Sequence, residues 1–363
     1  MLERVFHAWE RHLAAISKDR VVRPFEWGLD WLPRNGHAPD AAPAQVLAAW
    51  VTEVMADTDR FFTPPPIDEY CLTDWPDPAA RGEKLLTFPS ALQTPHPENN
   101  TVTCRLFPAR AVRLKRFSRA SRAAVLVLPQ WNSDSQGHVG LCRLLAWNGM
   151  TALRLSLPYH DRRMPPELTR ADYIVSSNVA RTLQVCRQAV LDGRRAVRWL
   201  AAQGFDRIGI LGTSLGSCLA LLTTAHEPLI RAQALNHISP YFADVVWRGI
   251  STRHVRESLD GHIDLDLLRA LWKPISPRWY LDRVRDRRTL LVYARYDLTF
   301  PVDLSEDLVR EFRERRVPHE VAALRCGHYS TGKTPFKFVD GWVLSRFLRN
   351  ALVTNTSADP TAL

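Results

Sequence analysis

The stretch RIGILGTSLG, residues Arg207–Gly216, decides the fold of this chain. Its first half, Arg207–Leu211, predicts a buried strand, and the mainly apolar run Leu215–His226 predicts a helix. Between them, Gly212–Gly216 fits the pattern G-x-S-x-G, a tight turn whose glycines allow close packing and whose serine is strained. We therefore expect Ser214 at the carboxyl edge of a sheet, where open α/β folds bind their ligands.

Strands and helices alternate on both sides of this turn. Further strands are expected at residues 123–128, 151–157, 231–238, 288–294 and 317–324. Helices are expected at residues 139–148, 171–203, 215–226 and 336–350. Apolar strands that alternate with helices of this length are typical of a parallel sheet covered on both faces. The sequence therefore predicts an α/β core over residues 121–352.

The first 120 residues follow a different pattern, with many prolines. Two amphipathic stretches, Leu2–Ile16 and Pro43–Phe62, predict helices. Residues 83–88 and 101–107 alternate like strands around a polar loop, which predicts a β-hairpin. We interpret this region as a packed N-terminal extension rather than an independent domain.

The residues that could activate Ser214 follow it in the sequence. A serine hydroxyl needs a base to take its proton, and a carboxylate orients that base when it is a histidine. Asp297 stands at the end of an expected strand, and His328 stands in a Cys-Gly-His turn before the last helix. We predict a catalytic triad of Ser214, Asp297 and His328. Asp303 is the alternative acid, but it is expected on a helix.

An oxyanion hole is expected next to Ser214. One donor should be the backbone N–H of Leu215, the residue after the nucleophile. The other should come from the loop after the first core strand, Pro129-Gln130-Trp131-Asn132. We favour the Trp131 N–H, with Gln130 as the second choice.

Together these motifs resemble an α/β-hydrolase-superfamily serine hydrolase over residues 121–350. Within that superfamily the dienelactone hydrolase and acetyl xylan esterase-like branch is the most similar. Acetyl xylan esterases of that type carry His-Gly-Tyr-Asn in the oxyanion loop, where this chain has Pro129-Gln130-Trp131-Asn132. The resemblance implies an α/β-hydrolase fold and an acyl-serine mechanism that needs no metal and no organic cofactor.

Substrate contacts are expected from loops at the same edge of the sheet. A mainly helical insert at residues 240–285 should form part of a cap, and its aromatic side chains either line the pocket or pack the insert onto the core. Arg162 or Arg163 could bind a substrate carboxylate or phosphate, although a salt-bridge cluster within their loop is the simpler interpretation. His237, His254 and His262 lack metal-binding spacing and are interpreted as structural. The candidate substrate-binding residues are Gln130, His160, Arg162 and Trp247.

Composition excludes several other classes of protein. The chain has 363 residues and a net charge of +10, but its arginines are spread along the sequence rather than clustered as in a nucleic-acid site. No apolar run approaches the ~20 residues of a membrane-spanning helix. Six scattered cysteines and a charged N-terminus favour a cytoplasmic protein with reduced thiols. Residues 353–363 are expected to be a flexible tail.

These features predict an enzyme that hydrolyses a small or medium, uncharged acyl ester, with a small molecule as its partner. A thioesterase or lipid deacylase would use the same triad. A non-catalytic binding protein on the same scaffold is the alternative from a different class. The oligomeric state, the acyl group and the alcohol are left open by the sequence.

Overall fold

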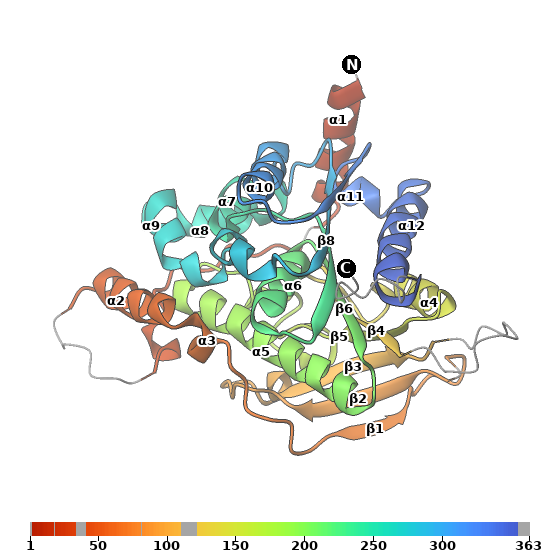
Figure 1. Cartoon of the computed structure of the whole chain (residues 1–363). Helices are drawn as coiled ribbons and strands as arrows, with labels where there is room; N and C mark the ends of the chain where they lie inside the picture. The colour runs from red at the N-terminus through yellow and green to blue at the C-terminus, as the bar shows by residue number, and fades with distance from the viewer. Residues whose placement is uncertain (1, 18, 34–40, 81, 110–121, 355–363) are drawn as a thin grey trace, which may run out of the picture.

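One nine-stranded sheet organises the chain in the computed structural model, which describes residues 2–17, 19–33, 41–80, 82–109 and 122–354 (Figure 1). The strand order is β1-β2-β3-β5-β4-β6-β7-β8-β9. The strands are β1 (Cys71–Asp74), β2 (Lys84–Pro89), β3 (Thr101–Phe107), β4 (Ala123–Leu128), β5 (Thr151–Leu155), β6 (Arg207–Thr213), β7 (Ile230–Asn236), β8 (Arg288–Ala294) and β9 (Glu320–Leu324). Strands β4 to β9 are parallel, and β1 to β3 are antiparallel to their neighbours.

Helices cover both faces of this sheet. They are α1 (Leu2–Ala15), α2 (Pro43–Ala56), α3 (Thr58–Phe61), α4 (Val139–Trp147), α5 (Val179–Ala202), α6 (Leu215–His226), α7 (Phe242–Arg248), α8 (Arg253–Leu259), α9 (Leu265–Leu271), α10 (Val302–Glu314), α11 (His328–Thr331) and α12 (Phe336–Arg349). Alternate residues of β4 divide between two apolar clusters. Leu126 packs with α5 and α6, whereas Val127 packs with α4 and α12. Figure 1 shows these two helix pairs on opposite sides of the strands.

The expected N-terminal extension contributes strands to the same sheet. The hairpin of β2 and β3 joins the sheet because β3 pairs antiparallel with β5, for example Cys104 with Leu155. A boundary at residue 121 would therefore divide one continuous sheet. The insert at 240–285 folds into α7, α8 and α9 with short 3-10 turns. Of the expected tail, residues 355–363 lie outside the described part of the chain.

Helix α5 begins eight residues later than its periodicity predicts. Asn178 caps it by accepting a hydrogen bond from the Arg181 N–H at 2.9 Å. The residues before it, 172–177, form turns and bends, and Asn178 makes an isolated parallel bridge with Glu26 of the N-terminal segment. The Glu26 N–H donates to the Ser177 carbonyl, and the Val179 N–H donates to the Glu26 carbonyl. A contact with a distant segment thus overrides local helix propensity.

A buried ion pair fastens the hairpin side of the sheet to α5. The Arg163 guanidinium lies 2.9 Å from Asp192, and both side chains are completely buried. Asp192 also accepts hydrogen bonds from the Ser90 hydroxyl and the Ala91 N–H. Arg163 in turn donates to the carbonyl of Asn99. Its charge is therefore satisfied only when loop, hairpin and helix are all in place.

We expect Asp192→Ala to lower the free energy of unfolding by about 3–5 kcal/mol, because it leaves the Arg163 charge buried without its partner. Urea denaturation followed by circular dichroism measures this loss. Asp303→Ala is the matched control, since its pair with Arg248 is exposed and should contribute about 1 kcal/mol or less. Equal losses in the two variants would contradict this account of the hairpin.

Candidate active site

Ser214 occupies the tight turn between β6 and α6 with φ 57° and ψ −120°, a strained backbone conformation. Two close approaches require the flanking glycines. A Cβ on Gly212 would lie 2.1 Å from the Gly216 carbonyl oxygen, and one on Gly216 would lie 2.2 Å from the Leu128 carbonyl oxygen. Hydrogen bonds hold the turn, since the Ser214 N–H donates to the Asn236 carbonyl at 2.7 Å. The strain is therefore sustained by the ends of neighbouring strands.

Asp297 and His328 meet beside this turn. Asp297 follows β8, and His328 opens α11 after β9. The His328 Nδ1 lies 3.0 Å from Asp297 Oδ2. The other carboxylate oxygen accepts the N–H groups of Thr299 and Phe300 at 2.8 and 2.7 Å. The carboxylate is therefore fixed by backbone donors on one side and directed at the imidazole on the other.

A second histidine binds the same carboxylate oxygen. His237 directly follows β7, and its Nδ1 lies 3.1 Å from Asp297 Oδ2. Its backbone is left-handed, with φ 58°, and its N–H donates to the Val292 carbonyl. His237 was interpreted from the sequence as structural and was not predicted to contact Asp297, although its position at a strand end was an available signal. The described site thus contains one carboxylate with two histidine donors.

The surroundings of the two histidines shift their pKa values in opposite directions. Burial alone would raise the pKa of Asp297, but the charge of His328 and hydrogen bonds from both rings lower it overall. Burial lowers the pKa of His328, yet the charge and hydrogen bond of Asp297 outweigh this and raise it. At His237 burial prevails, and its pKa is lowered. As the pH falls, His328 therefore takes up a proton before His237 does.

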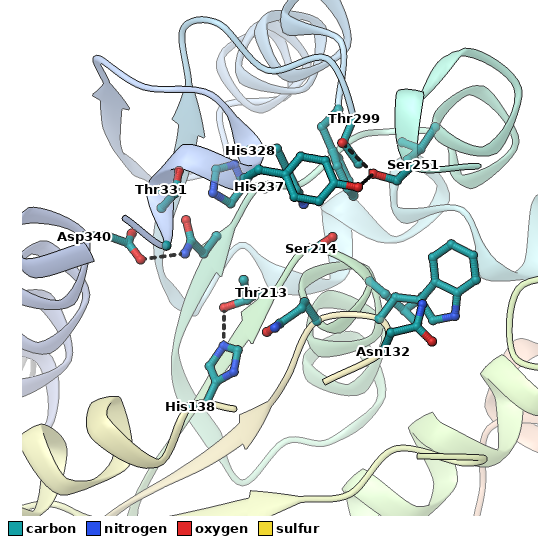
Figure 2. A pocket seen from close by; sticks show the side chains of 18 of the residues that line it. Asn132, His138, Thr213, Ser214, His237, Ser251, Thr299, His328, Thr331 and Asp340 are labelled. Atoms are coloured by element: carbon teal, nitrogen blue, oxygen red, sulfur yellow. Dashed lines mark hydrogen bonds between the residues drawn. The ribbon is translucent and has the colours of Figure 1, made fainter. Parts of the chain in front are cut away.

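Ser214 and His328 both line a pocket of about 890 Å³. Figure 2 shows Ser214 at its centre, with His328 and His237 above it. No hydrogen bond joins the Ser214 hydroxyl to His328 within the described residues. Catalytic hydrogen bonds are often long in structures without substrate and shorten in the substrate complex.

The expected oxyanion loop also lines this pocket, through Gln130, Trp131 and Asn132. Two hydrogen bonds anchor it to Ala171. The Trp131 indole donates to the Ala171 carbonyl at 2.8 Å, and the Asn132 side chain accepts the Ala171 N–H at 2.8 Å. Leu215 lines the pocket as the first residue of α6, where its N–H has no acceptor within the helix. The loop and the helix start thus meet beside Ser214.

The N-terminal segment holds the loop that carries His328. The buried Glu10 carboxylate of α1 accepts the N–H groups of Tyr329 and Ser330 at 2.8 and 2.9 Å. Further along, Arg20 donates to the Tyr329 hydroxyl, which also contacts Ser251 of the insert. Sequence patterns could not reveal the contacts of Glu10 and Arg20, because each contact joins residues more than 300 positions apart.

Three expected substrate contacts lie outside the pocket lining. His160 is buried behind the oxyanion loop, where its Nε2 accepts the Asn132 N–H at 3.0 Å. Arg162 is exposed, with its guanidinium 5.6 Å from the Trp75 ring centroid. Trp247 is half-buried, with Arg256 5.0 Å from its ring centroid. The three side chains thus contact other partners and are not part of the pocket lining.

The alternative acid Asp303 lies on α10 and pairs with Arg248 at 2.8 Å. It makes no contact with His328 among the described residues, which favours Asp297 as the partner of the imidazole.

His237, Asp297 and His328 bring three possible metal ligands within 4.8 Å. Hydrogen bonds from both rings to one carboxylate oxygen account for this proximity.

In the described ranges, no helix combines the length and the apolar character needed to cross a membrane.

We expect the two imidazoles to titrate separately. His328 should titrate above 6.5 and His237 below it, because Asp297 raises the first pKa and burial lowers the second. Asp297→Asn removes the negative charge and should therefore lower the pKa of His328. Ring ¹⁵N chemical shifts followed against pH measure both values, with His237→Asn as the variant that assigns the signals. An unchanged His328 pKa in Asp297→Asn would show that the two groups are not coupled.

A scan with protein-family models finds no match to this chain, and a sequence search of curated proteins finds none either. Solved structures do match it. An acetyl xylan esterase from Paenibacillus sp. R4 has a TM-score of 0.60 at 13% identity, over 89% of this chain and 98% of that protein. Acetyl Xylan Esterase 1 from Thermoanaerobacterium sp. JW/SL YS485 has a TM-score of 0.58 at 12% identity, over 88% of this chain and 99% of that protein.

The acylaminoacyl peptidase of Pyrococcus horikoshii matches with a TM-score of 0.56 at 13% identity, over 71% of this chain. This chain spans only 41% of the length of that peptidase. At such identities the likeness concerns the fold alone. The mostly parallel sheet with helices on both faces, as predicted from the sequence, is confirmed: the chain has the α/β-hydrolase fold.

Proposed function

We propose that this chain is a serine hydrolase that cleaves carboxylic esters through an acyl-serine intermediate. One observation carries the proposal: the strained turn at Ser214 and the hydrogen-bonded pair of Asp297 and His328 adjoin a single pocket. The shared fold with acetyl xylan esterases supports it. The identities of the catalytic residues and the preference for esters are parts of the proposal.

In the first half of the reaction, Ser214 Oγ attacks the ester carbonyl carbon while His328 Nε2 accepts its proton. The backbone N–H groups of Leu215 and Trp131 stabilise the oxyanion that forms, at about 3 kcal/mol for each donor. The bond to the alcohol oxygen then breaks, and His328 returns the proton to the departing alcohol. An acyl group remains on Ser214.

In the second half, water attacks the acyl-serine with His328 again as the base, which releases the acid and restores Ser214. Asp297 keeps the proton of neutral His328 on Nδ1, so that Nε2 faces the reacting atoms. His237 supports this arrangement as a neutral second donor to the Asp297 carboxylate. A neutral His237 adds no positive charge beside His328 when that ring becomes protonated.

The size of the pocket supports a small or medium substrate. About 890 Å³ lies within the range of sites that enclose small molecules. Phe242, Val245 and Val246 from the insert line it together with Ser251. An insert that contributes apolar wall residues limits the depth available to an acyl chain.

A fluorophosphonate probe should label Ser214 covalently, because it reacts only with an activated serine. Ser214→Ala and His328→Ala should each lower ester turnover by about 10⁴–10⁶-fold, and the double variant should be little worse, since triad residues act as a unit. Peptide mass spectrometry measures the labelling of Ser214. A p-nitrophenyl ester assay measures kcat for the variants. A wild-type protein that is folded but unlabelled would favour the non-catalytic scaffold.

Chain-length preference should peak at short or medium acyl groups. The measurement is kcat/KM for p-nitrophenyl esters from acetyl to palmitoyl, with and without detergent micelles. We expect a maximum at short to medium chains and no increase in rate above the micelle threshold. A steady rise to palmitoyl would favour the lipid deacylase, and faster turnover of matched thioesters would favour the thioesterase.

A further inference from the structure

A polar wall of the pocket lies next to Ser214 and takes no part in the mechanism above. Figure 2 shows Asp340 and His138 on one side of Ser214, with Ser251 on the other side. Asp340 comes from α12, and it is joined to Asn236 at the end of β7. Both Asp340 and Asn236 line the same pocket as Ser214.

Two oxygen atoms of this pair have no hydrogen-bond donor. The Asn236 amide donates to Asp340 Oδ2 at 3.0 Å. Within the described part of the chain, Asp340 Oδ1 and Asn236 Oδ1 are both buried and unpartnered. Leaving a buried acceptor without a donor is unfavourable, and more so for a charged group. Because Asp340 and Asn236 both line the pocket, a molecule bound there is one source of the missing donors.

Asp340 also lacks a compensating charge. No basic side chain of the described residues lies within 4.0 Å of its carboxylate, whereas several acids with buried side chains have arginine partners. These pairs are Asp161 with Arg154, Asp192 with Arg163 and Glu227 with Arg194. Lys337 lines the pocket one turn earlier on α12, but its ammonium lies 5.1 Å from the Phe338 ring centroid instead.

Burial raises the pKa of Asp340 to about 7, and the hydrogen bond from Asn236 offsets only part of this effect. Near neutral pH the carboxyl group is therefore divided between its acid and its ionised form. A cation beside it would favour the ionised form and gain a charge-assisted hydrogen bond.

The pair is close to the nucleophile along the sheet. The Asn236 carbonyl accepts the N–H of Ser214 at 2.7 Å, so the residue that holds Asp340 is also the backbone partner of Ser214. The opposite part of the pocket is basic, since Arg20 bonds to the Tyr329 hydroxyl beside Ser251. Arg170 lines the pocket near Trp131, with its guanidinium 5.3 Å from that ring centroid. An ammonium group would be repelled there and attracted to Asp340.

We propose that Asp340 and Asn236 form a subsite for a protonated amine, so that the ester cleaved at Ser214 carries an ammonium group a short distance from its carbonyl. Asp340 Oδ1 and Asn236 Oδ1 are the acceptors available to the N–H of that group, and the carboxylate neutralises its charge. This inference rests on the proposed function. It replaces the uncharged substrate expected from the sequence, where nothing indicated that Asp340 would lie beside Ser214.

The test uses pairs of esters of equal shape. Ethyl 4-(dimethylamino)butanoate is compared with ethyl 5-methylhexanoate, and 2-(dimethylamino)ethyl butanoate with 3-methylbutyl butanoate. The first pair places the amine on the acyl side and the second on the alcohol side. We expect kcat/KM for the amine ester to exceed that of its hydrocarbon partner at least tenfold in one pair. Asp340→Asn should reduce this ratio to about one.

Asp303→Asn is the matched control, because Asp303 is an acid outside the pocket lining and should leave the ratio unchanged. Thermal unfolding and fluorophosphonate labelling show whether Asp340→Asn is folded. Absence of labelling in the wild-type protein would contradict the proposed function itself. Labelling with a ratio of one or less in both pairs would overturn only the amine subsite. A preference for the corresponding hydroxyl esters over the amines would overturn it as well.

Discussion

The carboxylate of Asp297 is the interaction on which the site depends, since one of its oxygens accepts hydrogen bonds from both His328 and His237. The other oxygen is held by the N–H groups of Thr299 and Phe300. A buried carboxylate without such donors would be strongly destabilised. Because the two histidines follow β9 and β7 and the acid follows β8, three neighbouring strand ends must be correctly placed together. The parallel sheet provides that placement.

The N-terminal region helps to complete this arrangement. Glu10 holds the backbone after His328, and Arg20 reaches the pocket through the Tyr329 hydroxyl. The hairpin from the same region extends the sheet beyond β5 and is tied to α5 through Asp192. The residues that the sequence predicted to be a packed N-terminal extension thus support both the sheet and the loop that carries the imidazole.

Charge is compensated differently in the core and in the pocket. In the core, acids such as Asp192 are paired with arginines and satisfied by backbone donors. Beside Ser214, Asp340 has an amide neighbour and no cation among the described residues. The proposed amine subsite would supply the charge that this carboxylate lacks. Substrate selection in this view comes from α12 and β7, and the chemistry comes from the turns after β6, β8 and β9.

The sequence by itself determined the parallel α/β sheet and the turn at Ser214, and it supported the choice of Asp297 and His328. These features depend on local patterns: apolar strands, a glycine-flanked turn, and polar residues that directly follow strands. Only the tertiary structure decided the contacts of Glu10, His237 and Asp340, because each of these residues bonds to a segment distant in the chain. It also turned His160, Arg162 and Trp247 away from the pocket lining. The order of the strands predicts where a loop lies. The direction of a side chain in that loop depends on neighbours that only the packed structure brings together.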